Sequence, residues 1–116
     1  MEAMLIAFLD ERMVVPVVGK VPNPRPTRFV RVWRTGGSAV NRVLERPIVT
    51  VQAWAEDDAT SSAALLECRS FLFDQHTLMP LVRGFEETTG PYFDPDPETG
   101  IDRYSMSVQM SVRAAR

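Results

Sequence analysis

RYSMSVQMSVR, residues 103–113, alternates apolar and small polar side chains without a break. The apolar positions of this run are Tyr104, Met106, Val108, Met110 and Val112, and serine or glutamine stands at each position between them. A strict period of two is typical of a β-strand with one face in the core. The run therefore predicts a strand whose second face is uncharged and meets either water or a polar neighbour.

A second pair of strands is predicted in the first half of the chain. Residues 28–35, RFVRVWRT, alternate valine with larger side chains, and residues 47–55, PIVTVQAWA, do the same on their return. The turn-forming residues between the two runs are Gly36, Gly37, Ser38 and Asn41. Two strands separated by such residues predict a hairpin with a long tip.

One face of this hairpin has an unusual composition. Period-two spacing places valines on one side of the first strand and Phe29, Arg31 and Trp33 on the other. Trp54 of the returning strand is expected on the same side as Trp33. A solvated face needs no large aromatic side chains, and a face buried in a core has no place for an unpaired guanidinium. We therefore expect this side to be covered by something other than solvent.

Two helices are predicted to pack on the sheet. Apolar residues at helical spacing in residues 2–13 indicate an amphipathic helix, whose apolar stripe begins at Met1. The Ala-rich residues 58–75 follow a run of three carboxylates, residues 56–58, which stabilise the start of a helix. Small residues in its first turns predict a central helix that lies close to the sheet.

The remaining segments are an arm, a weaker strand and a loop. Four prolines after the first helix prevent helix formation and leave room only for a short edge strand near residues 14–18. Residues 82–88 are a weaker strand candidate, and glycine and proline mark residues 90–100 as a projecting loop or the far end of a hairpin. The element order predicts one α+β domain over residues 1–116, with a mostly antiparallel sheet of four or five strands and both helices on one face.

Composition limits the class of protein. A chain of 116 residues with 45% hydrophobic and 24% charged residues fits one ordinary globular domain. Cys68 is the only cysteine, which excludes an internal disulfide. The apolar start leads directly into Asp10 and Glu11, a pattern that predicts neither a secretory signal nor a membrane span. We expect a protein made in a reducing cytoplasm.

The net charge of −2 conceals a division along the chain. Residues 20–46 contain seven basic side chains and one acidic side chain, whereas residues 47–116 contain five basic and eleven acidic side chains. Such asymmetry indicates either an anionic partner or pairing between the two parts of the fold. The pairing can lie within one subunit or between neighbouring subunits.

No arrangement of side chains predicts catalysis. His76, the only histidine, falls at the end of the central helix, where it is expected to cap a carbonyl group. Cys68 lies beside the apolar stripe of that helix and is expected to be buried. Residues 94–100 imitate the start of a calcium loop, but Thr99 stands where glycine is required. We therefore expect no enzyme, no cofactor and no metal site.

Nucleic-acid binding is an alternative from a different class of function. Phe29, Arg31 and Trp33 combine aromatic rings with a cation, as surfaces that stack bases do. The net charge of −2, the single lysine and the lack of an RNA-recognition motif oppose this interpretation.

The chain as a whole resembles a known family. The run from Pro24 to Gly37, PRPTRFVRVWRTGG, and the run from Asp96 to Tyr104, DPETGIDRY, are its most specific parts. Together with the N-terminal helix and the Ala-rich helix, they resemble the tail terminator proteins of long-tailed bacteriophages, particularly those of actinobacterial hosts. The resemblance implies a small α+β subunit that forms a ring, typically of six copies, on a completed tail tube.

The resemblance also implies partners and a location. The ring halts further addition of tube protein and offers a surface to the head connector, so the partners are copies of the chain, the tail tube protein and the head–tail connector protein. The location is the head-proximal end of the tail in the virion, after synthesis in the host cytoplasm. No membrane is involved, and nucleic acid only passes through the ring lumen. A stopper or a tail-completion protein is the alternative connector role.

A closed ring uses heterologous contacts, in which one patch binds a different patch of the next copy. Aromatic residues and arginine are enriched at interface centres. The candidate contact residues are Arg28, Phe29, Arg31, Trp33, Arg34, Arg42, Trp54, Tyr92, Asp94 and Asp96. We expect Arg31 to pair with a neighbour's carboxylate or to face the lumen, and residues 35–46 and 90–101 to make contacts. The alternative is that both tryptophans pack inside the monomer under the N-terminal helix.

Overall fold

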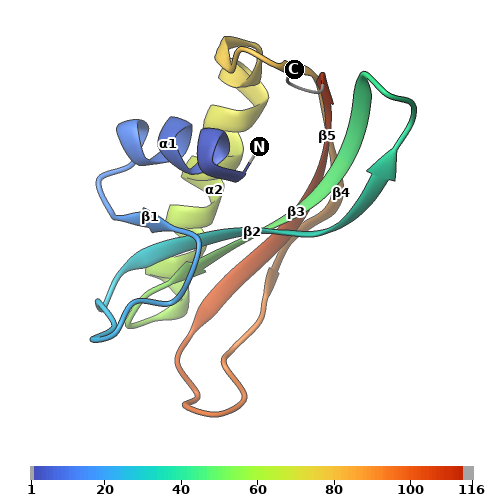
Figure 1. Cartoon of the computed structure of the whole chain (residues 1–116). Coiled ribbons are helices and arrows are strands. Elements are labelled where there is room, and N and C mark those ends of the chain that lie inside the picture. Colours follow the sequence, from blue (N-terminus) through green and yellow to red (C-terminus); the bar gives the residue numbers. More distant parts are fainter. Residues whose placement is uncertain (1, 114–116) are drawn as a thin grey trace.

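A computed structural model describes residues 2–113 of the chain. In it, two α-helices pack on one face of a five-stranded sheet (Figure 1). The helices are α1 (Glu2–Arg12), α2 (Asp58–Gln75) and the short 3-10 helix η1 (His76–Leu78). The strands are β1 (Val17–Val18), β2 (Phe29–Ala39), β3 (Leu44–Trp54), β4 (Val82–Phe93) and β5 (Arg103–Arg113). The predicted α+β class is confirmed. Met1 and Arg116, which the sequence interpretation included, lie outside the described residues.

The strand order across the sheet is β1-β2-β3-β5-β4. β1 runs parallel to β2, and every other neighbouring pair is antiparallel. In the β3–β5 pair, Leu44 lies opposite Arg113 and Trp54 lies opposite Arg103. The β2–β3 turn and the β4–β5 loop therefore lie at opposite ends of the sheet, and the molecule measures 42 Å along its longest axis and 25 Å along the other two.

The core lies between the helices and the apolar face of the sheet. The fully buried strand residues on this face are Val30, Val32, Val49, Val51, Ala53, Met106, Val108 and Met110. The buried helix residues are Leu5, Phe8 and Leu9 of α1 and Leu65, Cys68 and Leu72 of α2. Each large apolar side chain buried here contributes about 1.5–3 kcal/mol, so this layer supplies most of the driving force for folding. The alternation predicted for β5 is confirmed.

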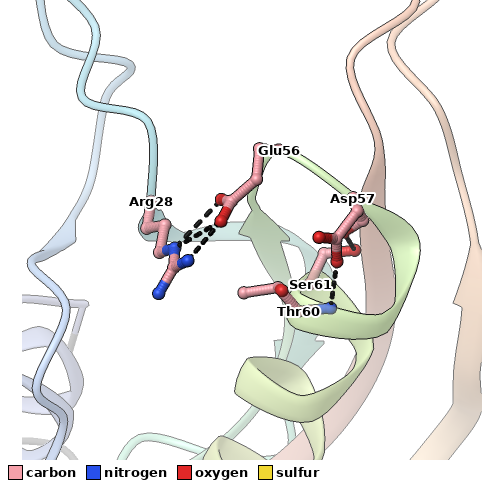
Figure 2. Close-up of polar contacts among 5 residues, drawn as sticks. All are labelled: Arg28, Glu56, Asp57, Thr60 and Ser61. Atoms are coloured by element: carbon pink, nitrogen blue, oxygen red, sulfur yellow. Dashed lines mark hydrogen bonds and ion pairs between the residues drawn. The ribbon is translucent and has the colours of Figure 1, made fainter.

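The start of α2 is fixed by side chains that the sequence predicted. The Asp57 carboxylate accepts a hydrogen bond of 2.7 Å from the backbone N–H of Thr60, and the Ser61 hydroxyl donates to the Asp57 carbonyl oxygen (Figure 2). The Thr60 bonds lower the pKa of Asp57, because they favour its ionised form. Neither α1 nor α2, the α-helices of residues 2–113, has the length and apolarity needed to span a membrane.

The β2–β3 connection differs from the prediction. Gly36, Gly37 and Ser38 were expected in the turn, but β2 continues through them to Ala39, and the turn is confined to residues 40–43. A register shift between Arg34 and Gly36 lets the strand continue past the glycines. Gly37 has a φ of +94°, a conformation that only glycine adopts without strain.

β4 is longer than the predicted residues 82–88 and includes Gly90 and Pro91, so of the two alternatives for residues 90–100 the structure shows the far end of a hairpin. The strand runs to Phe93 with register shifts on either side of Thr89. β4 is the outer strand of the sheet, so a proline can lack its N–H there without breaking a central ladder. The loop is reduced to residues 94–102, at the far end of the β4–β5 hairpin.

Replacement of Gly37 by alanine should destabilise the fold. A Cβ atom at this position would lie 2.6 Å from Pro47 Cα and 2.7 Å from Ile48 N, in addition to the strained φ. We expect the free energy of unfolding to fall by about 1–3 kcal/mol in urea denaturation. The matched control is Gly84→Ala, whose Cβ would make only ordinary contacts with Ser111 at 3.5 Å. Equal stability of the two variants would contradict the assigned backbone conformation.

Candidate functional site

The sheet face opposite the helices is here called the open face. Strand register and side-chain contacts place the following side chains on it: Phe29, Arg31, Trp33, Thr35, Arg46, Ile48, Thr50, Gln52, Trp54, Glu86, Thr89, Tyr92, Arg103, Ser105, Ser107, Gln109 and Ser111. Both α1 and α2 pack on the other face (Figure 1). Trp33 and Trp54 share this face, as predicted. It is the face whose composition was unusual in the sequence.

Phe29 and Trp54 are enclosed within the chain at one end of the open face. Their rings stack with centroids 5.2 Å apart and an angle of 18°, and the residues are 1% and 5% exposed. The guanidinium groups of Arg25 and Arg103 lie 5.3 Å and 4.9 Å from the Trp54 ring centroid. The arm before β2 and an arginine of β5 therefore cover these rings within the chain, which argues against the predicted role of both rings as interface anchors. Neither ring lies under α1, which packs on the opposite face.

Arg31 and Trp33 lie further along β2 and are only half-buried. The Arg31 guanidinium lies 4.0 Å from the centroid of the Trp33 ring, an attractive cation–π arrangement. Arg31 Nε also donates a long hydrogen bond of 3.4 Å to the Gly19 carbonyl oxygen. Within residues 2–113, no carboxylate lies at ion-pair distance from Arg31. The Arg31–Trp33 pair therefore keeps part of its surface exposed and its guanidinium without a carboxylate partner in the described part of the chain.

A row of uncharged polar side chains crosses the middle of the open face. The Thr35 and Thr50 hydroxyl groups lie 3.0 Å apart, and Thr50 lies 3.5 Å from the Ser107 hydroxyl. Gln109 Nε2 donates a hydrogen bond of 3.2 Å to the Arg46 carbonyl oxygen. These groups lie on the neighbouring strands β2, β3 and β5, so they form a continuous row of hydrogen-bond donors and acceptors.

Asp94 is held against the open face by its own hairpin. Its Oδ2 accepts hydrogen bonds from the Ser105 hydroxyl at 2.8 Å and from Gln52 Nε2 at 3.3 Å. Arg103 lies 3.7 Å from the same oxygen and donates from Nε to the Asp94 carbonyl oxygen. The Asp94 carboxylate therefore has intrachain partners, which leaves it little capacity for the neighbour contact that the sequence predicted.

Asp96 stabilises the β4–β5 loop. Its carboxylate accepts a hydrogen bond of 2.7 Å from the Thr99 hydroxyl and one of 3.2 Å from the backbone N–H of Glu98. The Thr99 bond in particular lowers the pKa of Asp96. The loop also requires Gly100 at a φ of +72°. Asp96 acts here as a turn residue, and among residues 2–113 no three acidic, histidine or cysteine side chains are grouped as a metal site needs.

Part of the charge asymmetry is balanced within the chain. Three of the seven basic residues between positions 20 and 46 form intrachain ion pairs: Arg28 with Glu56, Arg34 with Glu45, and Arg46 with Glu86 (Figure 2 shows the first). The other four, which are Lys20, Arg25, Arg31 and Arg42, have no carboxylate of residues 2–113 at ion-pair distance. Pairing within the chain therefore accounts for three of the seven basic residues. The other four are consistent with either an anionic partner or pairing with a neighbouring subunit.

The remaining candidate residues lie in different places. Arg34 lies opposite the buried Val49 in the β2–β3 register. It follows Arg31 by three residues, and because successive strand residues point to opposite faces, its side chain lies on the helix side of the sheet. Arg28 is exposed beside the start of α2, Arg42 is exposed in the β2–β3 turn, and Tyr92 is 45% exposed near the end of β4. The ten predicted contact residues therefore do not form one surface.

The only cysteine and the only histidine lie where the sequence predicted, one buried in the core and one at the end of α2. Cys68 is fully buried, and burial raises the pKa of its thiol to about 12. His76 Nδ1 lies 2.9 Å from the Leu72 carbonyl oxygen at the end of α2, in a capping position.

A cleft that the sequence did not reveal lies at the β4–β5 loop end of the sheet. It has a volume of about 440 Å³ and is lined by residues 25–27, 54–56 and 99–102. Arg25, Glu56 and Asp102 are its charged lining residues. Three segments distant in sequence form it, so no local pattern could indicate it.

The two tryptophans should respond differently to truncation. Trp54→Ala removes an enclosed indole and should lower the free energy of unfolding by roughly 3–5 kcal/mol. Trp33→Ala removes a half-buried ring with one cation–π contact and should cost about 1 kcal/mol. Urea denaturation of both variants, followed by circular dichroism, measures the difference. A larger loss for Trp33→Ala would contradict the enclosure of Trp54.

The Arg28–Glu56 pair predicts a specific loss of stability in acid. Hydrogen bonds from Arg28 lower the pKa of Glu56 from its ordinary value of 4.5 to about 2, so the folded state favours the ionised carboxylate. The resulting stabilisation is fully present above pH 4.5 and is lost as the pH falls through about 2. Glu56→Gln should therefore lose less stability than the wild type across this range in urea denaturation. The control Glu98→Gln replaces an exposed loop carboxylate and should show the pH dependence of the wild type. If Glu56→Gln also showed the pH dependence of the wild type, the pairing of Arg28 with Glu56 would be contradicted.

No protein-family model matches the chain, and no curated protein is significantly similar to it in sequence. The resemblance to tail terminators therefore stays a prediction from the motifs quoted above, and the fold and the open face are what the structure adds to it.

Proposed function

We propose that the chain is a non-catalytic structural subunit of a homo-oligomeric ring that closes a phage tail tube, a tail terminator. The observation that carries the proposal is the open face, which has the half-buried Arg31–Trp33 pair and a row of neutral hydrogen-bonding groups. The quoted motifs and the α+β fold with a sheet free on one side are consistent with this role.

The chemistry of the open face favours a protein partner. Tryptophan and arginine are enriched at the centres of protein interfaces, where their large surfaces are desolvated by a partner. Arg31 and Trp33 already hold each other in one arrangement, so less side-chain entropy is lost on binding. The hydroxyl row of Thr35, Thr50 and Ser107 offers hydrogen bonds to a polar surface around this centre.

The same face is poorly suited to nucleic acid. Binding to a phosphate backbone depends on several cations that replace counterions. Arg46 is paired with Glu86, and Arg103 lies 3.7 Å from Asp94. Arg31 lies over the Trp33 ring and competes with a base for stacking on it. The open face therefore offers few cations and little free aromatic surface to a nucleic acid strand.

The proposed role has three kinds of partner. Copies of the chain form the ring, the tail tube protein lies beneath it, and the head–tail connector protein binds above it. The ring stops tube growth by covering the surface to which the next tube subunits would bind. Assembly takes place in the host cytoplasm and leaves the protein at the head-proximal end of the virion tail.

The proposal predicts that the double variant Arg31→Ala/Trp33→Ala folds but assembles poorly. Loss of the Arg31–Trp33 pair from the open face should leave a subunit that fails to cap tail tubes, seen by light scattering and by negative-stain imaging with tubes. The control is Leu66→Ala/Arg83→Ala, which removes an exposed apolar side chain of α2 and an exposed arginine at the start of β4, away from the Arg31–Trp33 pair. Unaltered capping by the first variant would refute the proposal. Binding to connectors but not to tubes would reassign the protein to the stopper or tail-completion role.

A further inference from the structure

An exposed hairpin tip lies at one end of the sheet. The tip is residues 40–43, where Val40 is 54% exposed, Val43 is 37% exposed, and Arg42 is exposed between them. Asn41 fixes its shape, because Asn41 Oδ1 accepts hydrogen bonds of 2.9 Å and 3.0 Å from the backbone N–H groups of Val43 and Leu44. Two apolar side chains and one cation are thus presented on a preformed turn.

The cleft at the other end of the sheet, here called the end cleft, has complementary features. Its lining carries the carboxylates of Glu56 and Asp102 against the single guanidinium of Arg25. Arg28 pairs with Glu56, whereas no cation of residues 2–113 lies at ion-pair distance from Asp102. The apolar lining consists of Pro26, Trp54, Ala55 and Ile101. A volume of about 440 Å³ falls within the range of roughly 300–1,000 Å³ that is typical of binding pockets.

The tip and the end cleft of one chain cannot meet. They lie at opposite ends of β3, whose 11 residues separate them by roughly 33 Å at about 3.3 Å per residue. Only a second copy can bring a tip to an end cleft. Such a contact joins two different patches, and contacts of this heterologous type close into rings when the rotation between copies allows it.

We infer that the tip of one copy inserts into the end cleft of the next copy, so that Arg42 pairs with Asp102. Val40 and Val43 then lie against Pro26 and Ile101, the half-buried apolar residues of the cleft lining, while the unpaired carboxylate of Asp102 matches the charge of the tip. Arg25, the one cation of the cleft lining, lies over the Trp54 ring at 5.3 Å from its centroid. This inference rests on the proposed function, since it assigns the contact between neighbouring subunits of the ring, and it leaves the open face to other partners.

Charge reversal tests the pairing. Arg42→Glu and Asp102→Arg should each weaken self-association by about tenfold or more, measured by sedimentation velocity over a range of concentrations. The double variant Arg42→Glu/Asp102→Arg should recover most of the affinity. An equimolar mixture of the two single variants should also associate, because each supplies what the other lacks. The control Arg83→Glu makes the same charge change outside both patches and should associate like the wild type.

A disulfide tests the geometry independently of charge. The double variant Thr27→Cys/Val43→Cys carries one thiol at the end cleft and one on the tip, too far apart to join within one chain. Mild oxidation should give a ladder of linked subunits on non-reducing gels, and neither single variant should give more than dimers. The native Cys68 does not interfere, because it is fully buried.

The outcomes separate this contact from the proposed function. If Arg42→Glu caps tail tubes like the wild type and the disulfide ladder does not form, the tip–cleft contact is overturned. The terminator role would then remain intact. Charge-swap rescue and a ladder in a protein that never caps tubes would support the contact and overturn the terminator role. A wild-type chain that stays monomeric at every concentration and on tubes would overturn both.

Discussion

The packing of α2 on the valine and methionine side chains of β3 and β5 determines the rest of the structure. Side chains alternate along a strand, so burying Val51 and Met106 under the helix forces Gln52 and Ser105 to the opposite face. A register slip of one residue would exchange the two faces and is prevented by the cost of exposing the core. The polar open face is therefore a consequence of the core.

The sequence predicted the elements whose signal is local. The alternation of β5, the carboxylates before α2 and the capping position of His76 each depend on residues a few positions apart, and the structure confirms them. Gly36 and Gly37 misled the prediction of the turn, because the same residues serve a turn or a bulge within a strand. Local composition does not distinguish these two uses.

The candidate site was predicted less well, because it depends on contacts between distant segments. The composition of β2 indicated that its aromatic face is covered, but not that Arg25 and Arg103 cover Trp54 while Trp33 stays half-buried. The ion pair of Arg28 with Glu56 spans 28 positions, and the end cleft joins three separate segments. Charge counts along the chain indicated that pairing exists without indicating which arginines it leaves free.

The side chains that the proposals use lie in three separate places on the molecule. Arg31 and Trp33 lie on β2 within the open face, whereas Arg42 lies on a tip at one end of the sheet and Asp102 in a cleft at the other. A face of neutral hydrogen-bonding groups suits a polar protein surface, and a tip with a cleft suits a repeated contact between identical copies. Contacts at the two ends leave the face between them uncovered in every copy. In the ring proposed above, each copy would therefore present the same face, as binding to a symmetrical tube requires.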